Sequence, residues 1–121
     1  MPPSRFAATP QPPYYAVTFT TQRTGADEGG YAAMAERMDH LAATMPGYLG
    51  IESTRDAEGF GITISYWESE AAILAWRSHA THVLAQETGK QRWYKHYQLR
   101  VAKVERAYAG PEGRANRARD P

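Results

Sequence analysis

The sequence predicts an α+β fold of the ferredoxin-like type, a four-stranded antiparallel sheet with two helices on one face. Two observations lead to this prediction. The apolar residues switch between a period of two, typical of strands, and a period of about 3.6, typical of helices. The segments with these periods follow one another in the order β-α-β-β-α-β, and a chain of 121 residues is long enough for one such domain.

The first strand and the first helix differ clearly in period. Residues 14–21, YYAVTFTT, are aromatic and β-branched, which is typical of a strand. Residues 23–30 are rich in glycine and polar residues and predict a loop. Large apolar residues then recur at steps of four, three and four, which predicts a helix over 31–45 that Pro46 ends.

The rest of the domain is predicted to be a hairpin, a helix and a last strand. The segments 48–54 and 60–67 are strands joined by the turn RDAEG. Ser69 suits the N-cap of a helix that runs to about Glu87. The last strand covers about 97–108, and a slip in its apolar phase predicts a bulge.

The two ends of the chain are not expected to join the folded domain, which covers 14–108. Residues 1–13 contain five prolines and little to bury, and predict a flexible arm. Residues 109–121 predict a flexible tail whose three arginines are simply solvated.

The composition excludes several classes of function. There is no cysteine, so disulfides, thiolate metal sites, cysteine nucleophiles and Fe–S clusters are excluded. The net charge of +1 gives no electrostatic reason to expect nucleic acid or an anionic membrane as a partner. No apolar run approaches the roughly 18 residues of a membrane span, and the N-terminus lacks the apolar stretch of a signal peptide. We therefore expect a cytoplasmic protein.

Both faces of the predicted sheet are uncharged in its clearest strands. In 60–67 one face reads Phe/Ile/Ile/Tyr and the other Gly/Thr/Ser/Trp, whereas a solvated face normally carries charged residues. Two helices cover only one face, so a second sheet is expected to cover the other, which predicts a homodimer with its sheets face to face. The alternative is that the Thr/Ser face is merely hydrated.

The second helix predicts a pocket against the sheet. On a helical wheel Trp76, His79, Val83 and Gln86 fall on one side among small residues, where a packing face would normally carry Leu, Ile and Phe. The alternative interpretation makes Trp76 a core residue and His79 a hydrogen-bonded, half-buried histidine. A metal site is not expected, because no third ligand accompanies the two histidines of this helix.

Several segments resemble the antibiotic biosynthesis monooxygenase (ABM) domain of the dimeric α/β-barrel superfamily. They are MPGYLGIESTRD, GFGITISYWESEAAILAW and the terminal VERAY, and the resemblance covers about 14–108. It implies a dimeric α/β barrel. The superfamily includes cofactor-free quinol monooxygenases and haem-degrading enzymes, so the resemblance specifies the fold more closely than the activity.

The resemblance implies a cofactor-independent monooxygenase whose substrates are a small aromatic, quinol-like molecule and molecular oxygen. In such enzymes the substrate anion passes an electron to oxygen, so no metal, flavin or other cofactor is needed. His79 is then the catalytic base. The expected substrate-binding residues are Trp76, Trp67, Gln86, Thr18, Ser65 and Val83.

Two alternatives stay open. One is a non-catalytic dimeric module that binds a small molecule. The other is a haem-binding or haem-degrading protein, since such relatives place a tryptophan in the second helix, as Trp76 does, and an iron-ligating histidine about ten positions later. In this chain that position is Gln86, a poor iron ligand, which argues against haem.

Overall fold

The computed structural model describes residues 4–85 and 93–111 of the chain, and side chains of the second helix as far as Ala80. It contains six elements in the predicted order β-α-β-β-α-β. They are β1 (Tyr14–Arg23), α1 (Glu28–Ala43), β2 (Tyr48–Arg55), β3 (Phe60–Trp67), α2 (Glu70–Ala85) and β4 (Tyr94–Val104).

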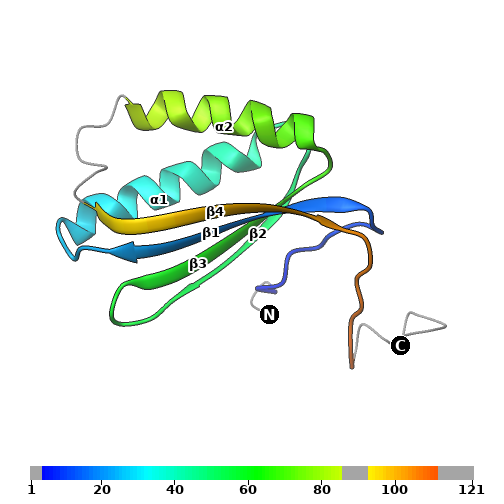
Figure 1. Ribbon diagram of the computed structural model, residues 1–121, viewed down its shortest axis with the longest axis horizontal. Coiled ribbons are helices and arrows are strands. Elements are labelled where there is room, and N and C mark those ends of the chain that lie inside the picture. The colour runs from blue at the N-terminus through cyan, green and yellow to red at the C-terminus, as the bar shows by residue number, and fades with distance from the viewer. Residues whose placement is uncertain (1–3, 86–92, 112–121) are drawn as a thin grey trace.

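The four strands form one antiparallel sheet in the order β2-β3-β1-β4. Both helices lie on the same side of this sheet (Figure 1). The ferredoxin-like prediction is thereby confirmed. No helix among the described residues is long and apolar enough to cross a membrane.

The strand register assigns each side chain to a face of the sheet. Val17 lies opposite Ser65 on β3 and opposite Val101 on β4, so all three side chains point to one side. Val17 belongs to the buried core together with Ala42 of α1 and Ile73 of α2, which makes this side the helix face. The alternate residues form the outer face.

Trp67, the last residue of β3, is the centre of the core. It is the one described residue with a large side chain that is fully buried, at 0% exposure. Its ring packs edge-on against Tyr48 of β2, with centroids 5.6 Å apart, and stacks on Trp76 of α2. Its indole N–H donates to Ser65 Oγ over 2.9 Å, so the buried donor is satisfied.

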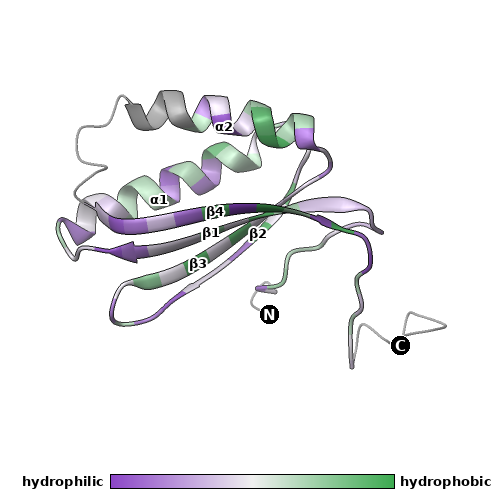
Figure 2. Cartoon of the chain, viewed as in Figure 1, coloured by the Kyte–Doolittle hydropathy of each residue, from purple (hydrophilic) through white to green (hydrophobic). Residues whose placement is uncertain are grey.

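The outer face of β3 carries large apolar side chains that no helix covers. Phe60 is 44% exposed, and Ile62 and Ile64 are partly exposed. Green bands on β3 in Figure 2 mark this apolar composition. At its other end the face is covered by the N-terminal segment, where the backbone N–H of Ala7 donates to Glu52 over 2.9 Å.

The largest differences from the predicted element boundaries lie at the start of α1 and in β4. Helix α1 begins at Glu28 rather than Tyr31, because the side chain of Asp27 accepts a hydrogen bond from the backbone N–H of Gly30 and caps the helix. Strand β4 begins at Tyr94 and ends at Val104, earlier than expected at both ends.

The predicted bulge in the second half of β4 was wrong. The pairing with β1 is regular there, and the register shift lies opposite Gln22 and Arg23, near the start of β4. The apolar residues switch from odd to even positions along β4 because this strand carries apolar side chains on both faces. Val101 points to the helix face, whereas Ala102 and Val104 point to the outer face.

We expect Trp67→Ala to lower the free energy of unfolding by about 3–5 kcal/mol, because it opens a cavity that Tyr48 and Trp76 cannot fill. Urea denaturation followed by circular dichroism measures the loss. Leu74→Ala on the exposed side of α2 is the matched control and should change the value by less than about 0.5 kcal/mol. Equal losses in the two variants would contradict the central place of Trp67.

Candidate functional site

A row of three rings leads from the core to the surface beside α2. The rings of Trp67 and Trp76 are stacked, with centroids 6.0 Å apart and planes at 22°. The ring of His79, one turn further along α2, lies 6.1 Å from that of Trp76. Trp67 is buried, Trp76 is half-buried and His79 is exposed, so the row ends in an accessible imidazole.

The start of α2 holds this row in place. Ser69 precedes the helix, and its hydroxyl accepts a hydrogen bond from the backbone N–H of Ala72 over 3.1 Å. Glu70 places a negative charge in the first turn, where the helix dipole favours it. Helix α2 begins only three residues after Trp67. Its second turn therefore brings Trp76 over the Trp67 indole.

An apolar strip lies on the same side of the sheet and is not covered by α2. Leu99 and Val101 of β4 are 48% and 49% exposed, although both point to the helix face. Phe19 of β1 lies between the core and this strip, opposite Leu99. Neighbouring exposed apolar side chains of this kind often mark a binding surface.

The structure brings together four of the predicted site residues. Trp67, Trp76 and His79 form the row of rings, and Ser65 lies directly below it, bonded to the indole of Trp67. By accepting this bond, Ser65 helps to position the Trp67 ring.

One predicted residue is not brought to this site, and two cannot be placed. Thr18, predicted to bind the substrate, lies opposite Ile64 and Arg100, on the outer face of the sheet and away from the row of rings. Side chains alternate along a strand, and Thr18 follows the core residue Val17. The side chain of Val83 and the whole of Gln86 lie outside the described residues.

Among the described residues, the structure does not show an enclosed pocket between α2 and the sheet. One of the two hollows described lies on α1, around Arg37 and Leu41, and the other lies at the far end of the sheet, around Arg23. Neither is lined by Trp76 or His79. The stacked indoles of Trp67 and Trp76 lie between α2 and β3, and the described side chains beside them, His79 among them, form an open surface.

The open surface has the groups needed to bind a flat aromatic molecule. The faces of Trp76 and Phe19 offer stacking partners, and the strip of Leu99 and Val101 offers apolar contact. The imidazole of His79 can accept a proton from a bound hydroxyl group. Within the described part of the chain, no three His, Asp or Glu side chains are grouped so that they could hold a metal ion.

The alternation of the last strand puts Leu99 and Val101 on one face. A residue pattern does not say whether that face stays exposed. Their exposure depends on where α2 crosses the sheet, which a residue pattern does not specify. The signal available was the edge position of β4, because an edge strand has only one neighbour.

A family model described as antibiotic biosynthesis monooxygenase matches residues 13–88 of the chain. The protein YqjZ of Bacillus subtilis (strain 168) is 54% identical over 98 residues, which cover 81% of this chain and 85% of YqjZ. The jasmonate monooxygenase ABM of Pyricularia oryzae is 31% identical over 94 residues. These cover 74% of this chain and 43% of the fungal protein, so the chain spans less than half the length of that relative.

Solved structures confirm the fold. The crystal structure of a mutant of SnoaB, a cofactor-independent oxygenase from Streptomyces nogalater, matches with a TM-score of 0.60 at 14% identity. The match covers 78% of this chain and 95% of that one. At 14% identity the match shows that the two proteins share a fold.

We expect Leu99→Lys to weaken the binding of an aromatic ligand by about tenfold or more, because the ligand loses an apolar contact and meets a charge. The measurement is quenching of tryptophan fluorescence by 1,4-naphthoquinone. Leu74→Lys, on the exposed side of α2, is the control and should bind as the parent does. Unchanged affinity in Leu99→Lys would exclude the apolar strip as the binding surface.

Proposed function

Because the chain belongs to the antibiotic biosynthesis monooxygenase family, we propose that it is a monooxygenase that oxidises a small aromatic, quinol-like molecule without a cofactor. The observation that carries the proposal is that the row of Trp67, Trp76 and His79 and the exposed apolar strip of β4 lie on the same face of the sheet. A flat substrate stacked there has its hydroxyl group near the imidazole.

The proposed reaction takes all its electrons from the substrate. His79 accepts the proton of a phenolic hydroxyl, and the resulting anion passes one electron to O₂. The carbon radical and the reduced oxygen then combine to form a C–O bond, and loss of water leaves a carbonyl group. The ring C–H carbon that combines with oxygen becomes C=O, and the phenolic carbon becomes the second C=O of a quinone, a four-electron oxidation of the substrate. One oxygen atom enters the product, and the other takes up the ring hydrogen and the proton held by His79 and leaves as water. The protein binds, deprotonates and excludes water.

The relatives support an oxygenase activity, but they do not identify the substrate. SnoaB is a cofactor-independent oxygenase of similar fold, and the fungal relative is a jasmonate monooxygenase. Jasmonate is not aromatic, so a substrate panel should hold it beside quinols and polycyclic phenols.

A second copy of the chain is part of the proposal. The outer face of β3 exposes Phe60 and part of Ile62 and Ile64, an uncharged surface that a second sheet would cover. Two sheets packed in this way form the dimeric α/β barrel that the sequence predicts.

One observation favours a second candidate function. His79 is exposed in the single chain, whereas a general base works best in a site that excludes water. A dimeric module that binds an aromatic molecule without oxidising it would also use the Trp76 face and the apolar strip. Binding without oxygen consumption across the panel would favour this candidate.

We expect the metal-free protein to consume oxygen with a quinol or polycyclic phenol, and His79→Ala to slow the reaction by roughly 10²–10⁴-fold, as loss of a general base does. An oxygen electrode measures the rate. His40→Ala, which removes an exposed histidine from α1, is the control and should keep the parent rate. Equal rates in parent and His79→Ala would remove His79 from the proposed role.

We expect Phe60→Lys to convert the dimer into monomers, because it places a charge in the proposed interface. Phe60 is already exposed in the single chain, so the substitution should not disturb the fold of the monomer. Light scattering coupled to size exclusion measures the mass. Leu74→Lys should stay dimeric, since it lies on the helix side. A parent that is monomeric at high concentration would contradict the proposed dimer.

A further inference from the structure

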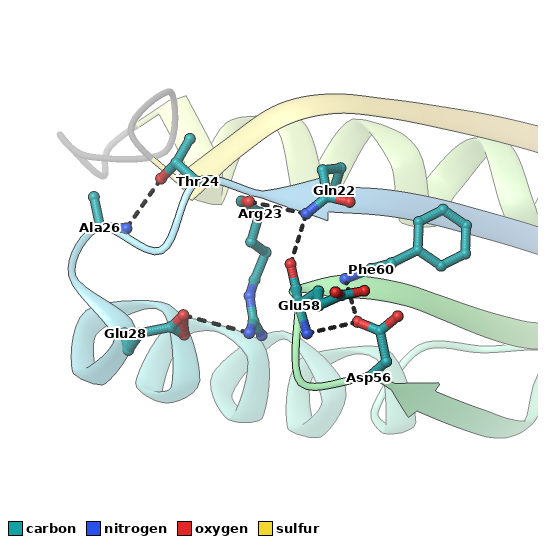
Figure 3. Close-up of polar contacts among 8 residues, drawn as sticks. All are labelled: Gln22, Arg23, Thr24, Ala26, Glu28, Asp56, Glu58 and Phe60. Carbon is teal, nitrogen blue, oxygen red and sulfur yellow. Dashed lines mark hydrogen bonds and ion pairs between the residues drawn. The ribbon is translucent and has the colours of Figure 1, made fainter.

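Two arginines meet one tyrosine at the end of the sheet opposite Trp67. The guanidinium carbon of Arg23, at the end of β1, lies 4.8 Å from the ring centroid of Tyr31 on α1. The guanidinium carbon of Arg55, at the end of β2, lies 5.1 Å from the same centroid. The side chain of Arg23 is only 12% exposed and reaches toward the start of α1 (Figure 3).

This cluster is rich in hydrogen-bond donors and short of acceptors. Within the described residues, Arg23 Nε is buried without a hydrogen-bond partner. Trp93 Nε1 is buried and unpartnered as well, and the Trp93 ring lies 6.0 Å from that of Tyr31. Buried donors of this kind are rare in folded proteins and call for an acceptor.

The carboxyl groups near these two arginines belong to Glu28 and Asp39. Arg23 Nη2 lies 3.3 Å from Glu28 Oε2, but the Glu28 side chain is 53% exposed, so water screens the pair. Near Arg55, burial raises the pKa of Asp39 above its usual value, outweighing the opposite effects of His40 and Arg55. Burial above all raises the pKa of Tyr94, which also shares a hydrogen bond with Tyr31, so the phenol of Tyr94 stays neutral.

A small cavity lies beside the cluster. Its volume is about 10 Å³, close to that of one water molecule. Its lining includes Thr21, Arg23, Tyr31, Arg55, Gly61 and Thr63. A Cβ added at Gly61 would lie 3.3 Å from Arg55 Cβ and 3.5 Å from Thr21 Oγ1.

We propose that this cavity is a binding site for one small monovalent anion, either a halide or a single carboxylate group, held by Arg23 and Arg55. Bonds from guanidinium groups to an anion are stronger than bonds between neutral groups. The anion would accept from the unpartnered Arg23 Nε and offset the repulsion between the two cations. It would also tie the first turns of α1 to the ends of β1 and β2.

The anion site borders the aromatic surface beside α2, because Phe19 lines the cavity and also lies next to the apolar strip, opposite Leu99. Phe19 packs against Tyr94 with centroids 5.7 Å apart, and Tyr94 packs against Tyr31 at 5.8 Å. This aromatic cluster lies between Arg23 and the apolar strip. The arginines of the anion site take no part in the proposed reaction, so the site does not depend on the proposed oxygenase activity.

The test is a titration of the full-length protein with sodium chloride, bromide or formate, at constant ionic strength set by sodium gluconate. The indole N–H of Trp93 in ¹H–¹⁵N NMR spectra is the readout, because its ring contacts Tyr31. We expect a saturable shift of this signal that gluconate does not produce. A response to halides alone or to formate alone identifies which kind of anion the cavity takes.

Variants separate a specific site from general salt effects. Arg23→Lys keeps the charge but removes Nε, and we expect it to weaken anion binding at least tenfold. Arg55→Gln at an exposed position should also weaken it, which keeps the test valid if Arg23→Lys fails to fold. Arg77→Gln on α2 should bind as the parent does.

Three results would overturn the proposal. One is a Trp93 signal that does not move with any of the anions, as expected if a water molecule occupies the cavity. Another is a shift that rises linearly and equally with every salt. The third is parental affinity in both Arg23→Lys and Arg55→Gln.

Discussion

The rest of the structure depends on the burial of one indole, that of Trp67. It ends β3, contacts Tyr48 of β2 and stacks on Trp76 of α2, so one side chain joins the hairpin to the second helix. Its only polar atom is satisfied by Ser65, two residues earlier on the same strand. The two stacked indoles lie between α2 and the sheet, so their size sets the distance between α2 and β3.

Apolar surface stays exposed in two places. On the helix face, the edge strand β4 keeps Leu99 and Val101 about half exposed, at 48% and 49%. On the outer face, β3 exposes Phe60 and parts of its neighbours. Burying such side chains lowers the free energy by about 25 cal/mol for each Å² removed from water, so both surfaces favour a partner. We assign the first to a small aromatic ligand and the second to another copy of the chain.

The order and type of the elements could be predicted because they depend on local periodicity, as in the alternation from Phe60 to Trp67. The resemblance to the family, made on the same residues, is confirmed. The start of α1 was missed because capping by Asp27 depends on one side chain rather than on a period. The face of Thr18 could not be predicted because both faces of β1 are uncharged, so nothing in the pattern says which one meets the helices. The cluster around Tyr31 was missed because Arg23 and Arg55 are far apart in sequence and fell in segments predicted to be a loop and a turn.

The central claim is that a flat ligand binds on the helix face of the sheet, over β1 and β4 beside Trp76. The most direct measurement is the set of intermolecular nuclear Overhauser effects between the ring protons of a bound quinone and the methyl groups of the protein. The account predicts contacts to Leu99 and Val101, with none to Ile62 and Ile64 on the outer face. Contacts confined to Ile62 and Ile64 would place the ligand on the opposite side of the sheet and contradict the account.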